Sequence, residues 1–182
     1  MLKFSKISHP LPYSELVTLL KDAYSERLEA GLNFACASFD SEDLKKHLSE
    51  NAIVFGAFKD GKLVGMNVLN SIRKKCGFKF GTSEFGAIAT SHKRQGIGYR
   101  LFLERIKEAR KQKLDFILSD TAVPATSAIL YHKKVGFIEY GHSHYPGRTY
   151  ESINFILPLT FKGRLLSNWL GRKILGRFFT HK

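Results

Sequence analysis

The sequence EFGAIATSHKRQGIGYRL, residues 84–101, decides the fold. Residues 84–89 include the small and apolar residues typical of a strand, and the end of the stretch opens a helix. The apolar face of that helix is formed by Leu101, Phe102, Ile106 and Ala109. A basic turn with two glycines joins the two elements. The stretch therefore predicts a strand, a glycine turn and a helix in direct succession.

The turn is suited to binding a phosphate group. The N-terminus of a helix carries backbone N–H groups without internal partners and the positive end of the helix dipole. Gly96 and Gly98 have no Cβ, so an anion can approach these amides closely. Lys93, Arg94 and Arg100 add positive charge around the same point. We therefore expect an anionic ligand there.

Other phosphate motifs fit these residues less well. A P-loop needs a second glycine followed by Lys and Ser or Thr, which this stretch lacks. A dinucleotide fingerprint needs a glycine where Leu101 stands. A glycine turn that only joins strand to helix remains the structural alternative.

Two motifs together resemble those of one enzyme superfamily. KRQGIG, residues 93–98, resembles the Q/R-x-x-G-x-G/A signature of the GNAT superfamily of acyl-CoA-dependent N-acyltransferases. LYHKKVGF, residues 130–137, resembles its second signature, LYxxxGF, and the likeness extends over roughly residues 2–158. The chain departs from the pattern at Lys93, where Gln or Arg is usual, and at Pro124, where many members carry Asn. The resemblance implies transfer of an acetyl group from acetyl-CoA to a primary amine.

Composition indicates one globular domain in a reducing compartment. The chain has 182 residues, of which 43% are hydrophobic, enough for a single sizeable core. Cys36 and Cys76 form no C-x-x-C motif, and no segment has the ~20 apolar residues that span a bilayer. We expect a cytoplasmic protein with an acetyltransferase domain over residues 1–160 and a basic helical extension over residues 161–182.

The net charge of +13 favours anionic partners. Nucleic acid is the weaker candidate, because the sequence lacks a groove-binding motif or interleaved stacking aromatics. The extension contains six Lys or Arg residues and no acid.

The extension is predicted to be an amphipathic helix. Its apolar face would contain Phe161, Leu165, Leu166, Trp169, Leu170, Ile174, Phe178 and Phe179. Such a face can cover the domain, dock a second subunit in a homodimer or a partner protein, or lie on the anionic inner face of the membrane.

The remaining chain predicts alternating strands and helices. Strands are expected at residues 2–8, 52–59, 62–71, 80–89, 115–121, 137–142 and 152–158. Asp60-Gly61 is the strongest hairpin signal. Helices are expected from Ser14 to Gly31, from Asp40 or Ser41, and over residues 98–112 and 125–135. This order predicts an α/β (α+β) fold, GNAT-like, with a mixed and mostly antiparallel sheet and helices on both faces.

The apolar loop at residues 33–39 is read as a buried cover in preference to a substrate contact.

The resemblance also implies where acetyl-CoA binds. Its diphosphate would rest on the turn formed by Lys93, Arg94, Gln95, Gly96, Ile97, Gly98 and Tyr99. Its pantetheine arm would pair with the strand end at Ile88, Ala89 and Thr90, where two parallel strands diverge, much as a peptide adds to a sheet edge.

Tyr131 and Glu84 are the predicted catalytic residues. Tyr131 matches the family position that donates a proton to the CoA sulfur, although helical spacing with Leu130 and Val135 also allows a core role. The period-2 relation of Glu84 to Gly86 and Ile88 predicts that they share one strand face beside the thioester, which favours Glu84 as the base. Asp120 is the alternative base.

No metal is expected. His142 and His144 form an H-x-H pair without a third ligand, and they fit better as substrate-loop residues with Tyr145 and Arg148. Neither cysteine lies in a nucleophile motif, so we expect direct attack of the amine on the thioester. The alternative function is a non-catalytic acyl-CoA-binding or adaptor module.

Overall fold

The computed structural model describes residues 1–168 and residue 175. Within these residues one seven-stranded sheet contains β1 (Leu2–Lys6), β2 (Ile53–Lys59), β3 (Lys62–Lys75), β4 (Phe78–Ile88), β5 (Phe116–Ala122), β6 (Ile138–His144) and β7 (Glu151–Pro158). The strand order is β1-β2-β3-β4-β5-β7-β6, and only β4 and β5 are parallel. This confirms the predicted mixed, mostly antiparallel sheet.

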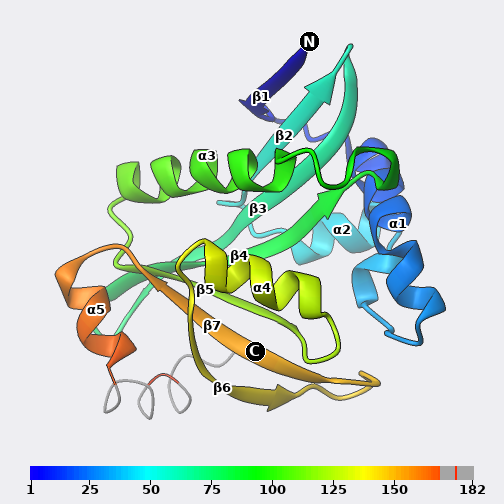
Figure 1. Cartoon of the computed structure of the whole chain (residues 1–182). Coiled ribbons are helices and arrows are strands. Elements are labelled where there is room, and N and C mark those ends of the chain that lie inside the picture. Colours follow the sequence, from blue (N-terminus) through cyan, green and yellow to red (C-terminus); the bar gives the residue numbers. More distant parts are fainter. Residues whose placement is uncertain (169–174, 176–182) are drawn as a thin grey trace.

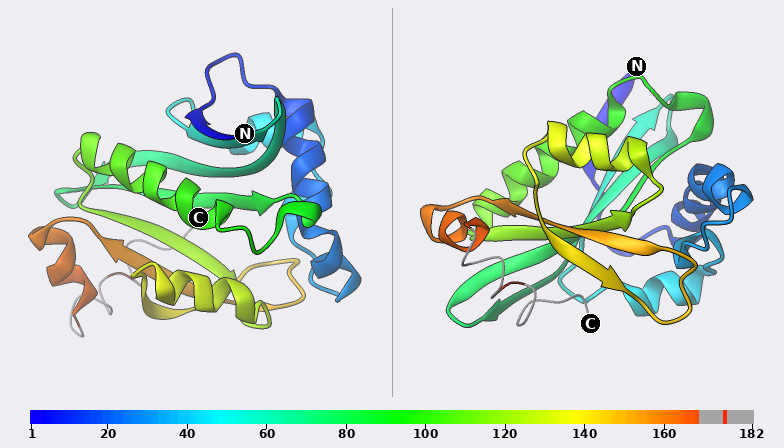
Figure 2. Two further views of the ribbon diagram at one scale, coloured as in Figure 1. Left: turned by 45° about the horizontal axis from the view of Figure 1, so that its top comes forward. Right: turned by 60° about the horizontal axis from the view of Figure 1, so that its bottom comes forward.

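Helices cover both faces of the sheet (Figures 1 and 2). The described helices are α1 (Tyr13–Glu29), α2 (Ser41–His47), α3 (Ile97–Lys111), α4 (Thr126–Lys134) and α5 (Phe161–Ser167), with short 3-10 turns at Ala35–Ala37 and Thr90–His92. Helices α1 and α2 bury one face over Met66, Val68 and Ala87. Helix α3 packs with Tyr131 of α4 on the other face, over Phe55 and Leu69.

Local sequence explains the start of α2 and the end of α1. Asp40 caps α2 through a reciprocal capping box with Asp43, and Gly31 ends α1 with a left-handed φ of 78°. The start of α1 differs from the prediction, because Pro12 occupies the N-cap position with its φ at −78°. Ser14 lies inside the first turn, where its carbonyl accepts the Thr18 hydroxyl.

Helix α5 is docked against the sheet. Its Thr160 cap donates a side-chain hydrogen bond to Asp115 Oδ1 at 2.9 Å, and Leu166 packs in a cluster with Phe80 and Phe116. Gly163 lies so close to Asp115 that a Cβ would meet its carbonyl oxygen at 2.1 Å.

The structure describes only part of the predicted apolar face of the extension. Leu166 is buried, whereas Phe161 and Leu165 are exposed. Residues 169, 170, 174, 178 and 179 of that face lie outside the described residues. Asn168 takes an extended backbone, so α5 ends before it.

Candidate active site

A fork in the sheet forms the centre of the site. Strands β4 and β5 pair at three positions, ending with Thr82 opposite Leu118. Beyond that pair the strands diverge over residues 83–88 and 119–122, which we call the fork (Figure 1). A cavity of about 710 Å³ opens at the fork and is lined from both faces of the sheet. The predicted divergence of two parallel strands therefore exists.

The turn before α3 leaves its helix N-terminus open. Gly96 is the N-cap with a φ of 74°, and no side chain of the described residues caps the helix. The first backbone bond into the helix runs from Arg100 N–H to the Gly96 carbonyl at 3.2 Å, so the amides of Ile97, Gly98 and Tyr99 precede the helical ladder. A Cβ on Gly96 would meet nothing within 4 Å. This cradle suits a diphosphate.

The rest of the predicted cofactor segment is partly occupied. Lys93 forms an ion pair with Glu26 at 2.7 Å, and the Thr90 amide donates to Asp22 Oδ2 at 2.8 Å. The Ala89 amide donates to the Val64 carbonyl of β3 at 2.9 Å. Since N–H groups alternate in direction along a strand, the Ile88 backbone faces the fork. Of these residues, Ile88 is the one suited to pair with a pantetheine arm.

The exposed Arg94 has a left-handed φ of 63°, and the exposed Gln95 donates to the Ser91 carbonyl at 3.4 Å.

Tyr131 lies on α4 at the cavity wall. Its hydroxyl donates to the Gly98 carbonyl at 3.1 Å, so it reaches the first turn of α3. Burial raises the pKa of the phenol above its ordinary value, an effect that the positive charge of Arg105 opposes. The phenol is therefore protonated at neutral pH. Its ring also packs edge-on to Phe102, so the core role and the cavity position coexist.

Glu84 lies on the other face of the sheet from Ile88, contrary to the prediction. Glu84 pairs with Val68, whose side chain lies in the core under α1, whereas Ile88 pairs with Gly65 and packs toward Ile97 of α3. A β-bulge between these pairs breaks the regular alternation.

The bulge contains Phe85, which has a left-handed φ of 50°. Such a conformation is unfavourable for a residue with a side chain. Tyr24 of α1 donates to the adjacent Gly86 carbonyl at 3.3 Å and ties the bulge to the helix. Periodicity alone gave no sign of this extra residue.

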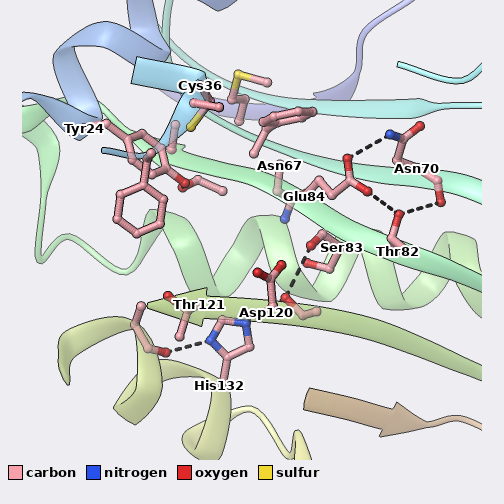
Figure 3. A pocket seen from close by; sticks show the side chains of 18 of the residues that line it. Tyr24, Cys36, Asn67, Asn70, Thr82, Ser83, Glu84, Asp120, Thr121 and His132 are labelled. Carbon is pink, nitrogen blue, oxygen red and sulfur yellow. Dashed lines mark hydrogen bonds between the residues drawn. The ribbon is translucent and has the colours of Figure 1, made fainter. Parts of the chain in front are cut away.

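The Glu84 carboxylate is held by two neutral donors. Asn70 Nδ2 donates to one oxygen at 2.8 Å and the Thr82 hydroxyl to the other at 2.5 Å (Figure 3). Asp120 points from β5 into the cavity and forms an ion pair with Arg148 at 3.1 Å. Both candidate bases thus line the cavity, and Asp120 already has a cationic partner.

Only two of the four substrate-loop residues predicted in the C-terminal hairpin line the cavity. Tyr145 and Arg148 line the cavity, with the guanidinium 4.2 Å from the centre of the Tyr145 ring. His142 and His144 do not line it and instead contact Glu151 on the neighbouring strand, at 3.3 and 3.8 Å.

The loop at residues 33–39 both covers the core and lines the cavity. Phe34, Cys36 and Phe39 belong to the core under α1 and also form the cavity wall. Burial raises the pKa of the Cys36 thiol to about 12, so it is a thiol and not a thiolate at neutral pH. The substrate-contact reading of this loop therefore has structural support.

Sequence reasoning missed a cluster of polar side chains at the closed end of the fork, where β4 and β5 stop pairing. His132 Nδ1 lies 2.7 Å from the Ala128 carbonyl, which can only accept, so Nδ1 carries the proton. Nε2 then accepts from the Ser119 hydroxyl at 2.9 Å. Arg105 of α3 lies near them and donates to the Ser83 hydroxyl. The apolar faces predicted for the two helices did not include Arg105 or His132, and periodicity gave no sign of these polar contacts.

Two further properties concern the described residues only. They contain no group of three or more His, Cys, Asp or Glu side chains that could hold a metal ion. None of their helices combines the length and apolar character needed to cross a membrane.

We predict that His132 lowers stability in acid. Burial lowers the pKa of this imidazole below its ordinary value of about 6.5, so the unfolded chain binds a proton more readily than the folded one. The free energy of unfolding therefore falls as pH drops from about 6.5 toward the lower folded value. Urea unfolding across this range should show a smaller loss for His132→Asn than for wild type. Equal losses would contradict the assignment.

Comparison with known proteins identifies the family. The model of the acetyltransferase (GNAT) family matches residues 14–137. Among solved structures, the ribosomal-protein-S18-alanine N-acetyltransferase from Escherichia coli has a TM-score of 0.71 at 16% identity, covering 88% of this chain and 96% of that one. An acetyltransferase of the GNAT family from Streptococcus pneumoniae has a TM-score of 0.67 at 20% identity, covering 88% and 100%.

A putative acetyltransferase from Acinetobacter baylyi has a TM-score of 0.71 at 19% identity, covering 87% of this chain and 93% of that one. No curated protein matches the chain. The structural likenesses confirm the fold, and the family model covers more than half of the sequence. The chain therefore belongs to the GNAT family of acetyltransferases.

Proposed function

We propose that this acetyltransferase moves the acetyl group of acetyl-CoA directly to a primary amine of an acceptor bound at the fork. The observation that supports this most is that the cavity crosses the sheet. Side chains of α3 and α4 line it from one face, and side chains of α1 and the β6–β7 hairpin line it from the other. Donor and acceptor can thus approach one another from opposite faces.

The donor would occupy the α3 and α4 face. Family members use acetyl-CoA as the donor. In this chain the amides of Ile97, Gly98 and Tyr99 would hold the diphosphate, since anions favour uncapped helix N-termini. The Ile88 backbone would pair with the pantetheine amides, and the Tyr131 hydroxyl would lie beside the sulfur.

Tyr131 would act as the acid. A departing thiolate needs a proton or a hydrogen bond, and a protonated phenol at the cavity wall can supply either. The raised pKa of Tyr131 keeps the proton available throughout the neutral range.

Glu84 would act as the base on the acceptor face. Its position opposite Val68 places it on the α1 and α2 side of the sheet, away from the donor. The neutral donors Asn70 and Thr82 orient the carboxylate without neutralising its charge. Asp120 is less suited, because its carboxylate is already engaged in the ion pair with Arg148 at 3.1 Å.

Direct transfer is favoured over an acyl-cysteine intermediate. Cys36 is the cysteine in the cavity wall, and its raised pKa of about 12 makes the thiol a poor nucleophile. Cys76 is exposed and does not line the cavity.

The acceptor is an amine on a small molecule or peptide. Amino sugars, nucleotide-linked sugars, small amines and protein N-termini form the test panel, with release of CoA thiol as the readout. A protein N-terminus belongs in it because one structural neighbour is named a ribosomal-protein-S18-alanine N-acetyltransferase. If CoA binds but no acceptor is acetylated, the non-catalytic binding module becomes the better description.

The Tyr131 role predicts a defect in turnover and not in binding. Tyr131→Phe should lower kcat by about a hundredfold, in the range of general-acid effects, while the Kd for CoA changes little. Tyr140→Phe is the matched control, because its hydroxyl is also buried, has no hydrogen-bond partner among the residues that the structure describes, and lies outside the cavity. Equal rates for Tyr131→Phe and wild type would remove Tyr131 from the mechanism.

The Glu84 role predicts a defect that depends on pH. Glu84→Gln should lower kcat/KM by about a hundredfold near neutral pH, because the acceptor amine then arrives protonated. The deficit should shrink as pH rises toward the pKa of the amine. A constant deficit, or a larger loss in Asp120→Asn, would assign the base elsewhere.

Residues 161–182 are proposed to associate with the anionic inner face of the membrane, in a cytoplasmic protein. Exposed Phe161 and Leu165 next to Lys162 and Arg164 support this. In the full chain, replacing Phe161 and Leu165 with Ser should reduce co-sedimentation with anionic liposomes severalfold. Unchanged co-sedimentation would favour protein contacts for this segment. Truncation is unsuitable, because Leu166 is part of the core.

A further inference from the structure

Arg105 is a buried cation in the cavity wall that lacks an acidic partner among the described residues. Arg105 is 3% exposed. It lines the cavity near Ser83, where β4 and β5 stop pairing. One terminal nitrogen donates to the Ser83 hydroxyl, and the guanidinium carbon lies 5.6 Å from the centre of the Phe102 ring. Within the described part of the chain its Nε–H has no hydrogen-bond partner. Among the described residues no carboxylate forms an ion pair with it.

The nearby acids are committed elsewhere. Glu84 is on the opposite face of the sheet with Asn70 and Thr82, and Asp120 is paired with Arg148. A buried guanidinium without a counter-ion is costly, which points to an anion as its missing partner. Burial lowers the pKa of Arg105 to about 10, so it still carries its charge at neutral pH.

The position of Arg105 corresponds to the acyl end of a bound donor. Arg105 is eight residues after Ile97, roughly 12 Å further along the helix axis than the phosphate cradle. Its partner Ser83 is the first residue of β4 beyond the last pair with β5. Tyr131, the proposed neighbour of the sulfur, contacts Gly98 near the other end. An acyl chain that continues past the sulfur therefore extends toward Arg105.

The chemistry of this end is wrong for a methyl group alone. An acetyl methyl is best accommodated by an apolar wall, but Arg105, Ser83, Ser119 and His132 present polar atoms here. The Ser119 hydroxyl forms a hydrogen bond with His132. The Nε–H of Arg105 forms none with the described residues. A carboxylate at this end would balance the charge of the guanidinium.

We propose that the chain also accepts CoA donors whose short acyl group ends in a carboxylate, and that Arg105 binds this carboxylate. The inference rests on the proposed function, because it uses the same donor orientation. The acceptor nitrogen forms a bond to the thioester carbonyl carbon and the carbon–sulfur bond breaks. Tyr131 protonates the departing sulfur, the proton from the amine goes to Glu84, and the distal carboxylate is unchanged.

A second role for Arg105 makes a different prediction. If its charge stabilised the departing thiolate, its loss would slow transfer from every donor equally. If it binds a distal carboxylate, its loss affects only donors that carry one. The two roles are therefore separable by comparing matched donors.

Calorimetry with inert CoA thioethers tests the proposal without turnover. The probes are S-(3-carboxypropyl)-CoA and S-butyl-CoA, which have the same chain length, and the corresponding shorter pair, S-(2-carboxyethyl)-CoA and S-propyl-CoA. For wild type we expect at least one carboxylated probe to bind about tenfold more tightly than its neutral partner. Arg105→Met should abolish or reverse this preference.

Several controls make the result decisive. Arg110→Met removes a cation from the exposed side of the same helix and should keep the preference. Ser83→Ala should weaken the preference partially and serves if Arg105→Met does not fold, as judged by thermal melting. The ratio of the transfer rate with succinyl-CoA to that with butyryl-CoA should change across these variants as the ratio of probe affinities does.

Equal affinity for both members of each pair in wild type would overturn the inference and leave acetyl transfer intact. A preference that survives Arg105→Met would overturn it as well, as would an equal fall in rate for succinyl-CoA and butyryl-CoA in that variant. Failure of wild type to bind CoA itself would instead remove the proposed function.

Discussion

The early end of hydrogen bonding between β4 and β5 is the constraint on which the rest of the structure depends. After Thr82 and Leu118 the two parallel strands separate, although both continue for several residues. Backbone groups on the inner edges then lack a strand partner, and buried backbone groups of this kind require one. At the open end, β4 leads through a glycine turn into α3. A ligand with amides along its length and a diphosphate at one end satisfies both features.

The fork also divides the chemistry between two faces. On β5, Ser119 contacts His132 of α4. The next residue, Asp120, contacts Arg148 of the β6–β7 hairpin, which lines the cavity from the other face of the sheet. On β4, the bulge at Phe85 separates Glu84 from the face on which Ile88 lies. A β-bulge beside a site re-aims a side chain, and here it turns a carboxylate toward the α1 and α2 face, opposite the face that we propose for the donor. The local cost of the strained Phe85 backbone is offset by contacts such as the Tyr24 hydrogen bond.

Much of the fold could be predicted from local signals. Gly31, Asp60-Gly61 and the glycine turn before α3 mark chain reversals through backbone conformations that favour glycine, and the structure has left-handed φ values at Gly31, Gly61 and Gly96. The mixed, mostly antiparallel sheet with helices on both faces followed from the order of the predicted elements, and the strand order came from the structure.

What could not be predicted depends on long-range contacts. The face of Glu84 depends on an extra residue in β4, which a period of two does not show. The spacing of Arg105 from Leu101 and Ala109 is consistent with its burial. Whether its charge has a carboxylate partner depends on acids from distant strands, such as Asp120. The Thr90 amide is used by Asp22 of α1, a pairing across 68 residues of sequence.

A crystal structure with CoA bound tests the central claim most directly. We expect the diphosphate to lie against the amides of Ile97–Tyr99 and the pantetheine between β4 and β5, with its sulfur within hydrogen-bonding distance of the Tyr131 hydroxyl. CoA bound elsewhere, with the fork and the turn before α3 unchanged and empty, would contradict it.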